Sequence, residues 1–285
     1  MKSYDIKWQN FHLKLSFPPL IMGILNVTPD SFSDGGQFFE TETAINHAKK
    51  MVAHGADIID IGGESTRPFA DPVTPEQEIK RVIPVITELS KEINVPISID
   101  TSKAVVARAA LEAGASIIND ISSFKDPEMP SVAKNANVPI ILMHMQGTPQ
   151  TMQLKPDYKD IIEEIFDELN IYIEKAVHVG IKKEMIIIDP GIGFGKTVND
   201  NFTIIQQLKR FQDLNVPLLI GPSRKSFIRK TLEKKHPDFL AHTNAIECAT
   251  QTTIAVSAIN GAHIVRVHNV FQTQITLTLL KAIQK

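Results

Sequence analysis

Short apolar runs alternate with helical patterns along almost the whole chain, and this alternation restricts the possible folds more than any other feature. The runs are bounded by glycine, proline or polar residues, and they lack a helical period. They are Leu20–Leu25, Asp57–Ile61, Pro96–Ile99, Ser116–Ile118, Val138–Met143, Met185–Ile188, Pro217–Ile220 and His263–Val267. Such runs are typical of strands that are buried on both faces of a parallel sheet.

Helices are predicted between these runs. The clearest one follows Thr74-Pro75, a helix-capping residue with proline at the first helical position, and its apolar residues recur every three or four positions up to Leu89. The others are Thr41–Gly55, Val105–Ala113, Ser131–Asn135, Lys159–Val179, Asn201–Arg210, Thr243–Ile259 and Gln274–Ile283. Right-handed strand–helix units repeated in this way close on themselves, which predicts an α/β fold with a single (β/α)₈ TIM barrel.

The whole chain, residues 1–285, is predicted to be one domain: a short N-terminal extension (1–19), expected to form a hairpin at the closed end, and the barrel (20–285). A doubly wound open sheet is the alternative. It usually carries G-x-G-x-x-G, but after Gly191 and Gly193 the third glycine is replaced by Lys196. A phosphate-binding P-loop is excluded as well, because Pro190 stands five residues before Gly195 where that motif needs glycine.

Composition excludes several classes of partner. Thirty basic and 32 acidic residues give a formal net charge of −2, so no nucleic-acid partner is expected. Cys248 is the only cysteine; we expect a packing residue rather than a nucleophile, in a reducing compartment. No stretch has the ~20 apolar residues of a membrane span, and the N-terminus has no apolar leader, so a cytoplasmic protein without a membrane partner is expected.

Polar side chains follow most of the predicted strands at their C-terminal ends. They are Asn26, Thr66, Arg67, Asp100, Asn119, Asp189, Lys225, Arg266 and His268. Each one alone could cap a helix or a turn, and Asp189 in particular could cap the glycine-rich turn that follows it. Because barrel enzymes build their active sites at this end of the strands, we interpret the set as one shared site.

The chemistry of these residues divides them into two groups. Asp100, Asn119 and Asp189 suit a flat heterocycle with several N–H donors, because carboxylates accept paired hydrogen bonds and an amide both donates and accepts. A metal is the alternative for two aspartates, but no histidine or glutamate stands at ligand spacing. The second group, Asn26, Arg67, Lys225, Arg266 and His268, forms a cationic rim suited to a phosphate or carboxylate.

The successive motifs resemble those of the dihydropteroate synthase family of the folate pathway. The segments are GILNVTPDSFSDGG, DIIDIGGESTRP, ISIDTSK, IINDIS, ILMHMQGTPQTMQ, IIIDPGIGFGKT, GPSRKSF and IVRVHNV, in this order between residues 20 and 280. The resemblance implies a pterin-binding TIM barrel that joins 6-hydroxymethyl-7,8-dihydropterin diphosphate to 4-aminobenzoate, releases pyrophosphate and uses Mg²⁺. It also implies a sulfonamide target and a homodimer packed through the last helices.

The resemblance assigns roles to individual residues. It implies pterin contacts from Asp100, Asn119, Met143, Asp189, Phe194, Gly221 and Lys225, and diphosphate or aminobenzoate contacts from Asn26, Thr66, Arg67, Ser226, Arg266 and His268. Asn26 would also lie at the metal. The catalytic residues would be Asp100, Asp189, Lys225, Arg67, Arg266 and His268, none of them a nucleophile. The loops at 27–39 and 62–74 are expected to be mobile and to close over the second substrate.

Two points remain open at this stage. The family often has Gly-Gly where this chain has Ser123-Phe124, which puts in doubt the shape of a loop near the aminobenzoate entrance or the dimer contact. A pterin-dependent methyltransferase of the same barrel family, which passes a methyl group to a corrinoid protein, is the alternative function. It is disfavoured because a methyl transfer has no diphosphate that needs the cationic SRKSF and RVH segments.

Overall fold

The central element is a parallel β-barrel. The computed structural model describes residues 2–28, 36–65, 72–148, 151–152, 156–242 and 244–284, with only the backbone for residues 36–40. The barrel strands are β3 (Leu20–Asn26), β4 (Ile58–Gly62), β5 (Ile97–Asp100), β6 (Ile117–Asp120), β7 (Ile140–Met143), β8 (Ile186–Asp189), β9 (Leu219–Ile220) and β10 (Ile264–Val267). Their order is β8-β7-β6-β5-β4-β3-β10-β9, and a parallel bridge between Ile188 and Leu218 joins the two outer strands. The predicted barrel is confirmed, and the doubly wound sheet is wrong.

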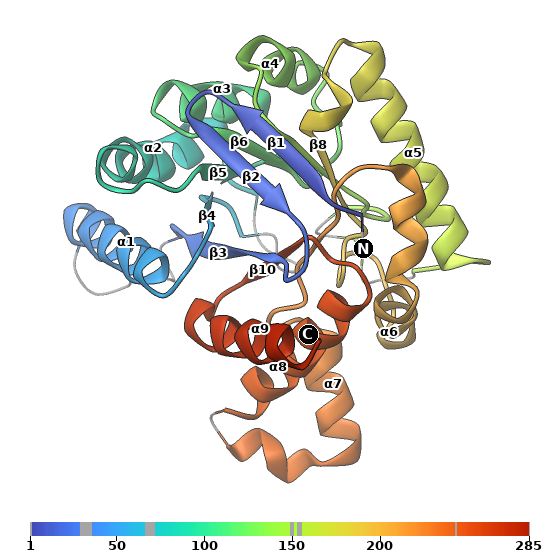
Figure 1. Ribbon diagram of the computed structural model, residues 1–285. Coiled ribbons are helices and arrows are strands. Elements are labelled where there is room, and N and C mark those ends of the chain that lie inside the picture. The colour runs from blue at the N-terminus through green and yellow to red at the C-terminus, as the bar shows by residue number, and fades with distance from the viewer. Residues whose placement is uncertain are drawn as a thin grey trace.

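Helices surround this barrel (Figure 1). They are α1 (Gly36–Ala53), α2 (Pro75–Glu92), α3 (Ala104–Glu112), α4 (Met129–Ala136), α5 (Ile161–His178), α6 (Val198–Gln206), α7 (Ser226–Lys235), α8 (Ala245–Ile259) and α9 (Val270–Ile283), with the 3₁₀ turns η2 (Lys183–Met185), η3 (Leu208–Leu214) and η4 (Pro237–Ala241). The predicted N-terminus of α2 is confirmed: the Thr74 hydroxyl accepts from the Gln77 N–H, and the Gln77 side chain accepts from the Thr74 N–H. This reciprocal pair satisfies two donors that a helix start otherwise leaves free.

Helix α7 is the element that the sequence pattern missed. It directly follows the β9 loop, and with η4 it projects beyond the barrel at the bottom of Figure 1. Its sequence, SFIRKTLEKK, is mostly polar, and only Phe227 and Ile228 are buried. A helix with such a short apolar face gives almost no periodic signal, which is why the pattern passed directly to the helix at Thr243–Ile259.

The N-terminal extension is a hairpin, as predicted. Strand β1 (Tyr4–Trp8) pairs antiparallel with β2 (Phe11–Leu15), and Figure 1 shows the two blue arrows lying across the end of the barrel. Alternate side chains point into the core: Ile6, Trp8, Leu13 and Leu15 are buried. The His263 ring, just before β10, bonds the Lys2 carbonyl through Nε2 at 2.9 Å. The hairpin therefore covers the amino-terminal end of the strands and leaves the opposite end for a site.

The barrel strands are buried along their length, which explains their isoleucine-rich sequences. In β4, for example, Ile58, Ile59 and Ile61 have no exposed surface. Burying one such side chain contributes about 1.5–3 kcal/mol relative to leaving it in water. The barrel is thus a rigid, packed frame that holds side chains at the strand ends in fixed positions.

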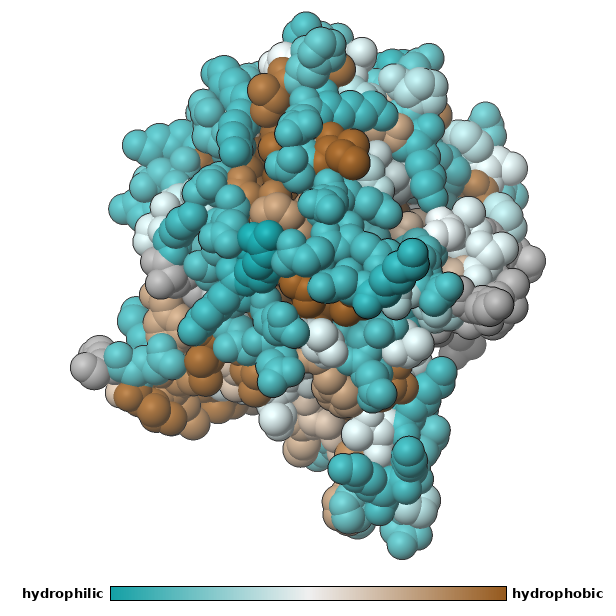
Figure 2. All heavy atoms as spheres, turned by 90° about the vertical axis from the view of Figure 1, so that its right-hand side faces the viewer, coloured by the Kyte–Doolittle hydropathy of each residue, from teal (hydrophilic) through white to brown (hydrophobic). Residues whose placement is uncertain are grey.

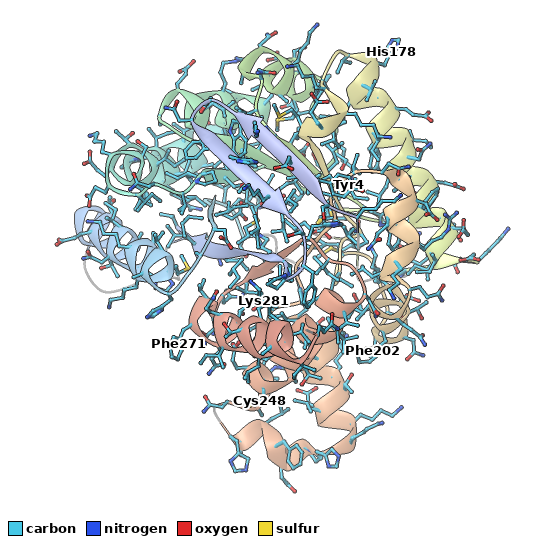
Figure 3. All side chains as sticks on the ribbon, in the orientation of Figure 1. Tyr4, His178, Phe202, Cys248, Phe271 and Lys281 are labelled. Carbon is cyan, nitrogen blue, oxygen red and sulfur yellow. The ribbon has the colours of Figure 1, made fainter. Side chains whose placement is uncertain are left out.

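One packing prediction is wrong. Cys248 is exposed on α8 rather than buried, and Figure 3 shows it on the outer side of that helix. No helix within the described part of the chain is long and apolar enough to span a bilayer.

Candidate active site

The predicted site residues gather at the carboxyl ends of the barrel strands. Asn26, Asp100, Asn119, Met143 and Asp189 lie at the ends of β3, β5, β6, β7 and β8, while Gly221, Lys225 and Ser226 follow β9, and Arg266 and His268 lie in and after β10. Thr66 and Arg67 lie outside the described residues. The loops 27–39 and 62–74 were expected to be mobile. Residues 29–35 and 66–71 of these loops also lie outside the described residues.

Arg266 lies between two carboxylates at the mouth of the barrel. Its Nε donates to Asp60 Oδ2 at 2.6 Å, and its Nη2 donates to Asp100 Oδ2 at 2.6 Å. The amide of Asn119 also donates to Asp60 Oδ2, at 3.2 Å. The division into an acidic group and a separate cationic rim is therefore wrong for Arg266, because barrel side chains from alternate strands meet in one interior layer.

Asp60 is a site residue that the sequence analysis did not single out. It lies inside β4, its side chain has no exposed surface, and it binds both Arg266 and Asn119. The sequence feature that could have identified Asp60 is its charge. An acid in the middle of a strand that is otherwise apolar and buried must have a partner, because an unpaired buried carboxylate is costly.

The acids at the ends of β5 and β8 are poised to accept hydrogen bonds. Burial raises the pKa of Asp100 to about 7, against the opposing charge of Arg266, and raises the pKa of Asp189 to about 6. Asp100 Oδ1 is buried without a partner among the described residues. Asp189 Oδ1 accepts from the Gly191 N–H at 2.7 Å, so Asp189 does cap the following turn, as the alternative interpretation expected. Its second oxygen remains for a ligand.

An aromatic and a lysine form the wall beside these acids. The Lys225 Nζ lies 3.9 Å from the centre of the Phe194 ring, a cation–π contact. Burial, and to a lesser extent the charge of the nearby Arg266, lowers the pKa of Lys225 to about 8. Phe194 packs with Met143 in a small apolar cluster that also contains Ile121, Met145 and Met152. A flat ring would find an apolar wall here, with charged groups at its edge.

The remaining predicted residues lie around this pocket. A side chain added at Gly62 would lie 3.7 Å from Asn26 Oδ1 and 3.6 Å from Asp100 Cβ, so glycine keeps the space between them open. His268 Nδ1 lies 3.0 Å from the Ser223 hydroxyl. Ser226, at the first turn of α7, lines a cavity of about 280 Å³ together with residues of the β8–α6 and α7 segments.

Comparison with known proteins agrees with these observations. Residues 22–268 match the family model described as pterin binding enzyme. A dihydropteroate synthase of Synechocystis sp. is 50% identical over 251 residues, which cover 88% of this chain and 85% of the relative. The chain belongs to the dihydropteroate synthase family.

Solved structures of the family have the same fold. The Xanthomonas albilineans dihydropteroate synthase with 4-aminobenzoic acid superimposes with a TM-score of 0.90 at 39% identity, covering 99% of both chains. The Yersinia pestis dihydropteroate synthase in a sulfonamide drug complex gives a TM-score of 0.89 at 39% identity, covering 98% of both chains. These relatives carry the synthase name, so the methyltransferase alternative gains no support from them.

The family's Gly-Gly position has an unusual backbone in this chain. Ser123 and Phe124 have φ of +49° and +69°, a left-handed region that favours glycine. The Asp120 carboxylate holds this loop by accepting from the Phe124 N–H at 2.7 Å, and the Ser123 hydroxyl donates to the Met143 carbonyl at 2.9 Å. Phe124 is buried. The loop thus adopts a conformation that glycine favours, and Ser123 ties it to the backbone of Met143 in the pocket wall.

Proposed function

We propose that this protein condenses 6-hydroxymethyl-7,8-dihydropterin diphosphate with 4-aminobenzoate, giving 7,8-dihydropteroate and pyrophosphate in folate biosynthesis. The observation that carries the proposal is the position of Asp100, Asn119 and Asp189 at the carboxyl ends of β5, β6 and β8, on the same side of the barrel mouth as Phe194 and Lys225. The single cysteine suits a reducing cytoplasm, where we place the reaction.

The pterin would lie flat in this pocket, with its N–H edge toward the acids. Among the described residues, Asp100 Oδ1 has no hydrogen-bond partner and Asp189 binds the Gly191 N–H through Oδ1 alone, and a pterin offers adjacent ring and amino N–H groups that match a carboxylate. Asn119 can both donate and accept at the ring edge. Phe194 and Met143 would cover the apolar part of the ring, and Lys225 would face a ring acceptor.

The reaction needs stabilisation of separating charges, not a nucleophilic side chain. The carbon–oxygen bond at the pterin methylene breaks, pyrophosphate leaves with the electron pair, and the carbon becomes cationic. The amine of aminobenzoate then forms the carbon–nitrogen bond and releases a proton. Arg266 and His268 would stabilise the departing anion, together with Arg67 outside the described residues, while Asp100 and Asp189 favour positive charge on the ring.

Mg²⁺ is part of the proposal. The described residues contain no group of three histidine, cysteine or acidic side chains able to enclose a metal ion. This donor set still fits Mg²⁺, which usually keeps waters and binds through one or two protein oxygens plus the phosphates of a substrate. The Asn26 side-chain oxygen at the end of β3 would be the protein ligand. When bound, the ion would neutralise charge on the diphosphate.

The direct test is product formation. The purified protein is incubated with dihydropterin diphosphate, 4-aminobenzoate and Mg²⁺, and dihydropteroate and pyrophosphate are measured together. Both should appear in equal amounts and should require both substrates. Release of pyrophosphate without dihydropteroate, or no reaction of a protein that binds the pterin, would contradict the proposal.

Pyrophosphate with Mg²⁺ should strengthen sulfonamide binding. The proposed aminobenzoate contacts come from separate loops, with Ser226 after β9 and with Thr66 and Arg67 outside the described residues. An anion held jointly by Asn26 and by cations of other loops would bring these loops together. We expect an increase in affinity of about tenfold or more, within the usual range of coupling between sites. Calorimetric titration with a sulfonamide, with and without pyrophosphate, measures it, and Mg²⁺ alone is the control. Equal affinity in all three would mean a preformed pocket.

We further propose that the protein is a homodimer that packs through α8 and α9. Exposed apolar residues recur every fourth position along α9, at Phe271, Ile275, Leu279 and Ile283, and Val256 and Ile259 on α8 are exposed as well. Figure 3 shows Phe271 on the outer side of this helix pair. In Figure 2, hydrophilic side chains cover most of the visible flank, and apolar ones gather toward its lower edge. A contiguous apolar stripe of this kind is typical of a protein interface.

Leu279→Arg should convert the dimer to a monomer, because it places a charge in the middle of the α9 stripe, where Leu279 is 60% exposed. Sedimentation at several concentrations measures the change in mass. Ile171→Arg is the matched control, since Ile171 is 58% exposed on α5, away from the stripe. A wild-type protein that is monomeric at all concentrations would exclude the dimer.

A further inference from the structure

The Phe194 wall of the pocket lies on an intrinsically pliable piece of backbone. Phe194 is flanked by Gly193 and Gly195, whose φ values are +82° and +61°. Glycine populates many backbone conformations at little cost, so this sequence does not by itself fix the direction of the Phe194 ring. Other groups must hold the turn in the observed conformation.

Part of this support comes from the segment after β7. A side chain added at Gly191 would collide with the His144 carbonyl oxygen, and one added at Gly195 would lie 2.5 Å from the Gln146 carbonyl oxygen. The turn therefore packs backbone to backbone against residues 144–146. The Tyr158 hydroxyl adds a hydrogen bond of 2.8 Å to the Gly195 carbonyl.

Lys196 supplies the contact to Phe194 itself. Its side chain is buried; Nζ donates to the Phe194 carbonyl at 2.9 Å and shares a hydrogen bond of 2.9 Å with His144 Nδ1. On the other side of the ring, His144 Nε2 lies 3.5 Å from Glu168 Oε2. The backbone N–H of His144 donates to the backbone carbonyl of Asp189 at 2.9 Å. Lys196 thus connects the two sides of the pterin pocket behind its wall.

Such a lysine is costly to bury. Burial lowers the pKa of Lys196 to about 7 and the pKa of His144 to about 2, so both shift toward their neutral forms. The charged groups that face Lys196 are Asp189, Glu168 and Asp200, which favour its charge, and Lys225, which opposes it. A methionine of similar length would fill the same space without this cost, and buried ionisable groups often add nothing to stability. We therefore expect Lys196 to contribute to the geometry of the pterin site rather than to the stability of the fold.

We propose that Lys196 is a positioning residue that fixes Phe194, and with it the Lys225 side chain, in the geometry that binds the pterin. The position of the Lys225 side chain depends on two contacts with this turn. Its Nζ lies over the Phe194 ring, and its Cδ would lie 2.9 Å from a side chain added at Gly193. A shift of the turn would move both the aromatic wall and the cation. This inference rests on the proposed pterin site.

Lys196→Met tests the inference. Calorimetry with 6-hydroxymethylpterin should give an affinity about tenfold weaker than wild type, a loss in the range of coupled neighbouring residues. In turnover, KM for the pterin diphosphate should rise by a similar factor, while kcat at saturation stays within about threefold. The thermal midpoint should remain equal to or above that of wild type. Lys209→Met, at an exposed lysine of η3 outside the cavity near Ser226, is the control and should change none of these values.

A double-mutant cycle with Phe194→Leu separates positioning from a general effect on the fold. If Lys196 acts through Phe194, adding Lys196→Met to Phe194→Leu should weaken pterin binding by clearly less than Lys196→Met does in the wild-type protein. If Lys196→Met yields no folded protein, Lys196→Gln takes its place in the same cycle. Unchanged affinity of the single variant, or additive losses in the cycle, would overturn the inference. A wild-type protein that does not bind the pterin would instead overturn the proposed function.

Discussion

Asp189→Asn should weaken pterin binding by about a hundredfold or more and leave the protein folded. Asparagine keeps an oxygen for the Gly191 N–H, so the turn that Asp189 caps is preserved. It replaces the second oxygen by an NH₂ group, which opposes the ring N–H groups instead of accepting from them. Losing a charge-assisted pair in a desolvated site costs about 2–5 kcal/mol. Calorimetry with 6-hydroxymethylpterin measures the loss.

The matched control for this prediction lies at the opposite end of the barrel. Asp57 is also a largely buried aspartate whose oxygen accepts from a backbone N–H, that of Ile21 at 2.8 Å. Asp57→Asn should therefore leave pterin affinity unchanged. An Asp189→Asn variant that binds as tightly as the Asp57→Asn control would show that Asp189 acts only as a turn cap.

The pH dependence of binding should identify the same acids. Burial raises the pKa of Asp189 to about 6 and that of Asp100 to about 7, both from an ordinary value of 3.8. Their contribution to folding stability is thus full below the unfolded pKa and is lost as the pH rises through about 6–7. Pterin binding has the opposite sign, because it requires the ionised form: affinity should rise through this window and level off above it. Asp189→Asn should remove the part of this rise near pH 6.

The sequence predicted those features that depend on local order along the chain. Apolar runs without helical period, such as Met185–Ile188, predict barrel strands because a strand buried on both faces has no polar positions. The barrel topology brings the C-terminal ends of these strands together. The sequence alone therefore predicts that Asp100, Asn119 and Asp189 lie in one site. The binding and catalytic roles assigned to these residues, and to the rest of the predicted site, remain predictions.

The sequence could not predict contacts that depend on side-chain direction. Asp60 and Arg266 are 206 residues apart in the sequence. They form a hydrogen bond only because both side chains point into the barrel. The same is true of Lys196, which follows a glycine-rich turn in the sequence but whose side chain turns inward to His144. Helix α7 was missed for a different reason, since its stability depends on two buried residues, Phe227 and Ile228, rather than on a periodic face.

Arg266→Met should cause the largest loss of stability of any single substitution in the site. The guanidinium neutralises Asp60, which is completely buried, and Asp100, which is nearly so. Methionine fills the volume but leaves two carboxylates in a desolvated space without a counter-charge. Removing one partner of a buried ion pair typically costs about 3–5 kcal/mol. Urea unfolding measures the change, and turnover should be lost as well, because Arg266 faces the proposed leaving group.

The surface of the protein offers a matched arginine. Arg210 also bonds two carboxylates, Glu163 through both Nε and Nη2 at 2.8 Å and Asp213 at 2.9 Å, but this group is exposed. Arg210→Met should leave the free energy of unfolding nearly unchanged, because water and salt screen exposed ion pairs. The two variants remove the same charge and the same number of partners. Besides its exposure, Arg210 differs in lying over the Phe166 ring, 3.8 Å from its centre, so its removal loses one further contact. Equal effects would therefore mean that the Arg266 pairs are hydrated and contribute as little as surface pairs do.

The pH profile of the Arg266→Met variant provides an independent criterion. Without the guanidinium, the pKa of Asp100 should rise further, because Arg266 is the main charge that opposes its desolvation. The folded variant then binds protons more tightly than the unfolded chain, so its stability is greatest at low pH and falls as the pH rises. The difference from wild type should therefore be largest above about pH 7 and should shrink toward about pH 5, where protonation removes the uncompensated charge. A cavity or a packing defect would give a loss that is independent of pH, and that result would assign Arg266 a steric role instead of an electrostatic one.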